Sequence, residues 1–246
     1  MSTADRIFTF ALAAQSSYGL FDDVNTPLSA LTEPERGDFS EIAARRFLGL
    51  SPATNEPFGT GFSVIAHKEN ESNGFSATVL ESSNAHHVLS IRGTEDAGDR
   101  LQDAKLALTG FAGDQAISLY RYYRRLITPG GAPVQYTTEE RQLLARLNIV
   151  VPGLPGSGLV GAAVLSFALA RDVGILRADG QVGSVLQPGE AITVTGHSLG
   201  GHLAILFGRF FRKSPIRCTR STRPELRLGG IWRLPSQASG PAMRHE

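Results

Sequence analysis

Residues 191–211 read AITVTGHSLGGHLAILFGRFF, and this stretch decides the fold prediction. Residues 192–195 (ITVT) alternate apolar and β-branched side chains, a pattern that predicts a short strand. The apolar residues that follow recur at helical spacing: Leu199, Leu203, Leu206, Phe207 and Phe210. Residues 196–200 (GHSLG) lie between the two patterns. The stretch therefore predicts a strand, a tight turn and a helix, in that order.

The turn has the G-x-S-x-G pattern of a nucleophile elbow, centred on Ser198 with His197 at the variable position. A serine hydroxyl becomes a good nucleophile when it is held out of the sheet, beside a base and near a helix N-terminus. Gly196 and Gly200 lack the Cβ atoms that would crowd such a turn, and Gly201 lets the helix approach the sheet. The alternative is an ordinary helix N-cap serine. The flanking strand and helix favour the nucleophile.

The elbow resembles that of the class 3 (fungal-type) lipases of the α/β-hydrolase superfamily, which commonly reads GHSLGG, as residues 196–201 do. A second segment, residues 88–94 (VLSIRGT), resembles the strand and R-G-T turn before the oxyanion loop of that family. Asp99 and Asp103 follow where the family often carries acids. Together the matches span about residues 60–211.

This resemblance implies an α/β fold, a three-layer α/β-hydrolase-like sandwich with a mainly parallel sheet. It implies hydrolysis of a lipid or small ester through an acyl-enzyme on Ser198, with Thr94 and the backbone N–H of Leu199 holding the oxyanion. No cofactor and no metal is expected. Transient contact with a lipid interface is expected, and nucleic acid is not an expected partner. The residues alone leave open that Thr94 caps the next turn.

The chain departs from the family after the elbow. α/β-Hydrolases carry the triad in the order Ser, then Asp or Glu, then His. Only 48 residues follow Ser198, and their acids and histidines are few: Glu225, Glu246, His202 and His245. His202 lies four residues along the same helix, so its ring is poorly placed to reach over the serine. We therefore identify no triad acid or base and expect the sheet to lack its last strands.

The expected domain organisation is an incomplete hydrolase-like domain over residues 1–211 and a basic, irregular tail over residues 212–246. The tail has eight Lys or Arg against two Glu, and we expect it to be a non-native end produced by a frameshift or a truncated gene model. A basic surface for nucleic acid or anionic membrane is the alternative, but basic residues scattered among Ser, Thr and Pro are typical of a solvated tail. A catalytically inactive fragment is a further alternative, since a serine without base and acid loses about 10⁴- to 10⁶-fold in rate.

A second alternative function is dinucleotide binding. Gly156, Gly158 and Gly161 fit the G-x-G-x-x-G pattern after the apolar residues 149–151. However, residues 152–155 (PGLP) separate that apolar run from the glycines, whereas the dinucleotide fingerprint needs its turn directly at the strand end.

Composition is that of an ordinary globular enzyme, with 246 residues, 41% hydrophobic, 19% charged and a net charge of +1. The single cysteine excludes an internal disulfide, and no Cys/His cluster has zinc spacing.

The N-terminus reads as an amphipathic helix rather than a secretory signal, with Asp5 and Arg6 near its start. Residues 149–170 carry no charge but are interrupted by Pro152 and Pro155, which predicts a buried helix after a loop rather than a transmembrane span. Both a cytoplasmic location and a signal-independent export route stay open.

Elsewhere the periodicity predicts helices over residues 39–48, 115–126 and 138–147, the last with capping-box spacing between Thr137 and Glu140. Strands are predicted over residues 62–66, 75–81 and 88–91, joined by short polar turns as a β-meander.

Overall fold

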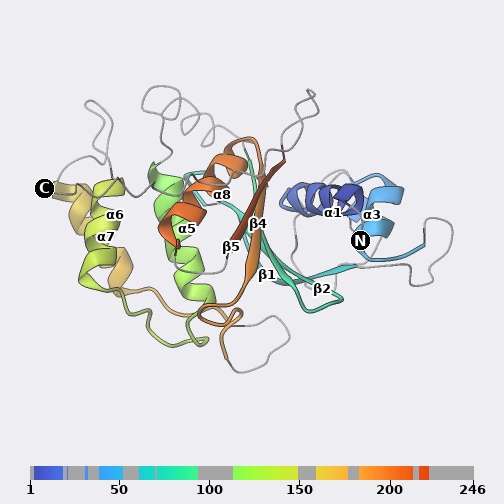
Figure 1. The fold of residues 1–246 in the computed structure, drawn as a ribbon. Helices are drawn as coiled ribbons and strands as arrows, with labels where there is room; N and C mark the ends of the chain where they lie inside the picture. The colour runs from blue at the N-terminus through green and yellow to red at the C-terminus, as the bar shows by residue number, and fades with distance from the viewer. Residues whose placement is uncertain are drawn as a thin grey trace, which may run out of the picture.

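Helices and strands both build the protein, which has a mixed α/β fold (Figure 1). The computed structural model describes residues 3–18, 21, 31–32, 39–51, 61–69, 71–93, 113–148, 159–176, 183–212 and 216–221. The elements in chain order are α1 (Thr3–Ser16), α3 (Glu41–Phe47), β1 (Phe62–Lys68), β2 (Ala77–Ser82), β3 (His87–Ile91), α5 (Gly113–Leu126), α6 (Thr138–Leu147), α7 (Leu159–Ala170), β4 (Ile192–His197), α8 (Leu199–Phe210) and β5 (Ile216–Ser221).

The five strands form one sheet in the order β1-β2-β3-β4-β5. Strands β1, β2 and β3 are antiparallel neighbours, which confirms the predicted meander. Strand β4 is parallel to both β3 and β5. The described sheet is therefore mixed rather than mainly parallel. The physical reason is the length of the connections: the turns between β1, β2 and β3 are short, and only antiparallel neighbours can be joined by such turns.

Helices cover both faces of the sheet. Helix α1 contacts β3, β4 and β5 on one face, beside α3, and α8 contacts the same strands on the other face. Helix α5 packs on α8, and Figure 1 shows α6 and α7 farther from the sheet than α5. This arrangement leaves the carboxyl ends of β3 and β4 next to the start of α8.

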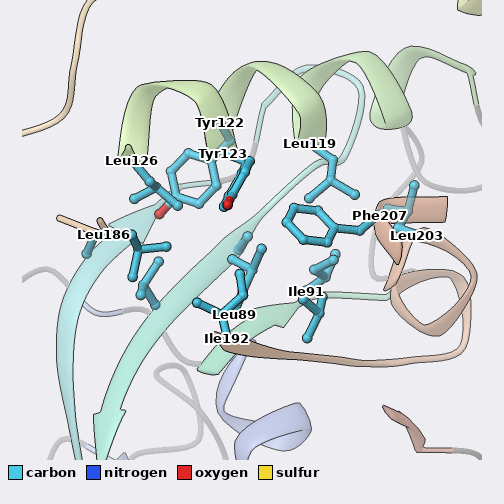
Figure 2. Close-up of a cluster of buried hydrophobic side chains, with 14 of the residues drawn as sticks. Leu89, Ile91, Leu119, Tyr122, Tyr123, Leu126, Leu186, Ile192, Leu203 and Phe207 are labelled. Atoms are coloured by element: carbon cyan, nitrogen blue, oxygen red, sulfur yellow. The ribbon is translucent and has the colours of Figure 1, made fainter. Parts of the chain in front are cut away.

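The larger hydrophobic core lies between the sheet and α5 and α8 (Figure 2). Alternate side chains of β3 and β4 point into it, because successive side chains of a strand face opposite sides. The labelled members are Leu89, Ile91, Leu119, Tyr122, Tyr123, Leu126, Leu186, Ile192, Leu203 and Phe207. On the opposite face of these strands, the buried residue Ser90 of β3 donates a hydrogen bond to the carbonyl oxygen of Ala13, a buried alanine of α1. Small side chains on both sides allow α1 to lie close to the strands.

The local helix predictions are confirmed, including the capping box, in which Thr137 and Glu140 exchange hydrogen bonds at the start of α6. The predicted irregular tail is wrong in one part, because residues 216–221 form strand β5. Strand β5 pairs with β4 in parallel register from Ile192↔Ile216 to His197↔Ser221. The edge of β4 that was expected to be uncovered therefore has a partner. Backbone groups of a buried strand need partners on both edges, and this requirement outweighs the weak strand pattern of these residues.

Helix α7 corrects another prediction. It was expected to be buried, yet Val164 is 62% exposed and Phe167 is 63% exposed. Its buried residue Leu169 packs with Ile117 and Tyr120 of α5 and with α6, whereas Val164 and Phe167 face outward. An uncharged sequence does not by itself reveal how many neighbours a helix has. No helix in the described ranges is both long enough and apolar enough to cross a membrane.

Candidate active site

Ser198 occupies the turn between β4 and α8, at the carboxyl end of β4. Its backbone has φ 53° and ψ −121°, and its side chain is exposed. A serine at positive φ is strained, and such strain persists only where the surrounding structure enforces it. Together with the flanking strand and helix, this is the geometry of a nucleophile elbow.

Ser198 directly precedes α8, but it lacks the features of an ordinary N-cap serine. Ser40 and Thr137 are the ordinary N-caps of α3 and α6, with extended backbones and side chains that accept hydrogen bonds from Ala43 N–H and Glu140 N–H. Ser198 has neither property: its backbone is not extended, and its side chain makes no cap hydrogen bond.

The predicted glycines of the elbow are required by close backbone contacts. A Cβ on Gly196 would lie 2.4 Å from the carbonyl carbon of Gly200. A Cβ on Gly200 would lie 2.2 Å from the carbonyl oxygen of Ile91. Both distances are far inside van der Waals contact with backbone atoms. Gly201, the third predicted glycine, is buried in the first turn of α8.

The structure describes one of the two oxyanion donors that the sequence predicts. Leu199 is the first residue of α8 and is buried, and an N–H at this position has no acceptor within its own helix. Thr94 lies outside the described residues, as do Asp99 and Asp103. The preceding residue, Gly93, is described and lies against the elbow, since its Cβ would be 2.5 Å from the carbonyl oxygen of His197. The ends of β3 and β4 thus converge at Ser198.

Two histidines lie at the far end of the sheet from Ser198. Val88 of β3 pairs with Thr193 of β4, so His86 and His87 are level with the start of β4. The run of β4 to Ser198 is about 16 Å at ~3.3 Å per residue. His86 Nε2 lies 2.8 Å from Thr193 Oγ1, and His87 lies between the carboxylates of Glu190 and Glu81. Neither ring is placed to serve the serine.

The remaining described histidines do not complete a triad either. His67 Nδ1 lies 2.9 Å from Thr78 Oγ1, on strands β1 and β2. His202 lies on α8, one turn after Ser198. His197 is directed to the α1 face, where its Nδ1 meets a tyrosine hydroxyl. Within the described ranges, no hydrogen bond joins the Ser198 hydroxyl to an imidazole or carboxylate, so we assign no base or acid.

The sequence motifs do not point to Tyr18, which lies in the N-terminal segment. Tyr18 follows the end of α1, and its hydroxyl lies 3.3 Å from Nδ1 of His197. The only signal in the sequence is the change from an alanine-rich run to Ser16 and Ser17, which indicates a helix end but no function. The contact joins residues 179 positions apart, so it arises from the tertiary fold.

Among the described residues, a strongly buried charge lies away from the elbow, at Asp172 in the outer helical layer. Its carboxylate accepts hydrogen bonds from Arg121, Arg125 and Tyr136. Burial raises the pKa of Asp172, but the hydrogen bonds from Arg121 and Tyr136 and the nearby arginine charges outweigh burial and lower it. Because three side chains donate hydrogen bonds to the Asp172 carboxylate, we assign it a structural role. No group of three or more potential metal ligands occurs among the residues that the structure describes.

The dinucleotide alternative receives no support from the placement of its helix. Gly156 and Gly158 lie outside the described residues, and Gly161 lies within α7. Helix α7 packs with α5 and α6 in the outer layer. A dinucleotide fingerprint instead needs its helix to follow a strand of the sheet and pack against it.

Comparison with known proteins adds no family assignment. No protein-family model, curated protein or solved structure matches this chain. The functional argument therefore depends on the geometry around Ser198 and on the sequence motifs that produce it.

Proposed function

We propose that this chain is a serine hydrolase of carboxylic esters, of a lipase or esterase lineage with an α/β-hydrolase fold. The observation that carries the proposal is the backbone of Ser198, at φ 53° and ψ −121° between a parallel strand and a helix, with an exposed side chain. Such strain in a serine is costly, by about 1–3 kcal/mol, and clusters at functional sites. A serine serving only as a cap has no need of it.

The arrangement of the sheet supports the same fold. Strands β3, β4 and β5 are consecutive parallel neighbours, and α8 returns from the end of β4 to cover them. The elbow lies at the carboxyl end of the central one of these three strands. Ligands of open α/β sheets bind at this end, because the loops that follow the strands gather there.

The proposed reaction is acyl transfer through the serine. The Ser198 hydroxyl attacks the ester carbonyl, and the developing oxyanion accepts hydrogen bonds from Leu199 N–H and from Thr94. The alcohol leaves with a proton, and water then releases the acid from the acyl-enzyme. This chemistry requires neither a metal nor an organic cofactor.

The proposed substrate class is a lipid or small ester. The exposed apolar surface of α7 and the following residues supports transient contact with a lipid interface, since large exposed apolar side chains mark interaction surfaces. Its large members are Val164, Phe167, Val173 and Leu176. The exposed cation Arg171 lies over the Phe167 ring at 5.1 Å, which is compatible with anionic lipid.

The test is hydrolysis of p-nitrophenyl butyrate and octanoate by the full chain and by Ser198→Ala from matched soluble preparations. We expect the substitution to lower kcat/KM by at least about 10³-fold. Ser40→Ala is the matched control, because it removes an ordinary N-cap serine and should leave the specific activity unchanged. Hydrolysis that persists in Ser198→Ala contradicts the proposal.

A catalytically inactive hydrolase-like protein is the second candidate. It is favoured by one observation: within the described ranges, Ser198 makes no hydrogen bond to a histidine or carboxylate. The same assay separates the two candidates. A folded wild-type chain with no more activity than Ser198→Ala favours the inactive protein.

A further inference from the structure

Three serine hydroxyl groups donate hydrogen bonds at the end of α1, and one of them joins the helix to the sheet. Ser16 Oγ and Ser17 Oγ each donate a 2.7 Å hydrogen bond to a carbonyl one turn earlier, those of Ala13 and Ala14. Ser90 of β3 also donates to the carbonyl of Ala13, which ties the helix to the sheet. The position of the next residue, Tyr18, is therefore set by both α1 and β3.

Tyr18 reaches from this fixed point to the elbow. Its hydroxyl lies 3.3 Å from His197 Nδ1, and the two rings meet edge to face with centroids 6.3 Å apart. Gly93, just after β3, lies against both partners: its Cβ would be 2.6 Å from the Tyr18 hydroxyl and 2.5 Å from the His197 carbonyl oxygen. Three chain segments thus converge on one small region, and Tyr18 contacts the other two.

We propose that Tyr18 is a positioning residue of the candidate active site. It holds His197, whose backbone continues directly into Ser198, and it fixes the spacing between the end of β3 and the elbow. In the proposed function, which this inference depends on, each of these two segments supplies one oxyanion donor. Tyr18 acts through His197 and Gly93.

The hydroxyl and the ring of Tyr18 have separable roles. The ring contacts the His197 ring edge to face, and Tyr18→Phe retains that contact while removing the hydrogen bond to His197. A misplacement of catalytic groups by about 1 Å can cost about 10²-fold in rate. Because Phe keeps most of the packing, we expect a smaller loss of about tenfold in the maximal rate, with little change in substrate affinity.

The first measurement is covalent labelling of the full-length chain by a fluorophosphonate, with Ser198→Ala as the blank. We expect Tyr18→Phe to lower the maximal labelling rate about tenfold and to change the half-saturating probe concentration less than about twofold. Tyr136→Phe is the matched control, because it removes a hydroxyl bonded to Asp172 in the outer layer and should label at the wild-type rate. Equal labelling of Tyr18→Phe and wild type overturns the inference and leaves the proposed function intact.

The second measurement requires no activity. Deuterium uptake by peptides covering residues 192–203 should rise in Tyr18→Phe and not in Tyr136→Phe, because the elbow loses an anchor. In labelling, the double variant Tyr18→Phe/His197→Gln should react no more than about twofold slower than the slower single variant. Multiplicative losses or unchanged uptake overturn the inference. A wild-type chain that the probe does not label contradicts the proposed function, and the uptake measurement then still decides whether Tyr18 holds the elbow.

Discussion

Gly200 and Ile91 are in direct backbone contact: a Cβ placed on Gly200 would lie 2.2 Å from the carbonyl oxygen of Ile91. This contact joins the first turn of α8 to the end of β3, and it places the elbow beside the segment that follows β3. The spacing of the candidate site thus depends on the absence of one carbon atom.

Gly200→Ala is expected to be strongly destabilising. The new methyl group meets backbone atoms of Ile91 and Arg92, which cannot rotate away as a side chain can. Overpacking of this kind costs about 1–3 kcal/mol, and we expect the upper part of that range. Urea unfolding followed by circular dichroism measures the change. Ala204→Gly on the same helix is the comparison variant, because it removes a methyl group instead of adding one. A Gly200→Ala protein as stable as wild type would refute the close contact.

Ser198→Gly is expected to stabilise the protein while abolishing the proposed ester hydrolysis. Glycine adopts φ 53° and ψ −121° at little cost, whereas serine is strained there. We expect a gain of about 1 kcal/mol relative to Ser198→Ala, which also lacks the hydroxyl but keeps the strain. Thermal unfolding of the two variants, measured side by side, tests the difference. Equal or lower stability of the glycine variant argues against strain at the elbow.

Asp172→Asn is expected to destabilise the outer helical layer. The substitution removes the charge partner of Arg121 and Arg125, at a carboxylate whose side chain is 2% exposed. Removal of one partner of a buried pair costs about 3–5 kcal/mol, and we expect about 2–4 because the two arginines are partly exposed. Urea unfolding at pH 7 measures the loss. Glu41→Gln, at an exposed pair with Arg45, serves as the control and should cost less than about 0.5 kcal/mol.

The contribution of Asp172 should depend on pH in one direction. Its pKa in the folded protein is lowered, so the unfolded chain binds the proton more readily. The stabilisation is complete well above the ordinary aspartate pKa of about 3.9 and is lost as the pH falls below it. The difference in unfolding free energy between wild type and Asp172→Asn should therefore shrink from pH 6 to pH 3. A difference that stays constant over this interval contradicts the lowered pKa.

Phe167→Ser tests the exposed surface of α7. Because Phe167 is 63% exposed, we expect little change in unfolding free energy and a several-fold loss of activity on emulsified esters, with hydrolysis of dissolved p-nitrophenyl butyrate retained. Leu169→Ser, at a buried position on the same helix, should instead lower stability by about 2 kcal/mol or more. Equal effects of Phe167→Ser on dissolved and emulsified substrates would exclude a role at the lipid interface.

The local features of the fold followed from short-range chemistry. Residues 137–140 predicted the capping box because its two hydrogen bonds lie within one helical turn. The elbow was predictable for the same reason, since its strand, glycines and helix are contiguous. The prediction that α7 is buried was wrong. An apolar sequence shows that a segment favours burial, but it does not show how many elements pack on that segment.

The strand–turn–helix around Ser198, its glycines and the meander of β1, β2 and β3 could be predicted from local sequence patterns. All three depend on neighbours close in the chain. Three other features became evident from the packed fold alone: β5 pairs with β4, α7 lies on the outside, and Tyr18 contacts His197, 179 positions away in the chain. These contacts depend on which surfaces remain to be covered once the elements pack. Backbone pairing and burial are satisfied over the whole molecule, and local patterns do not record them.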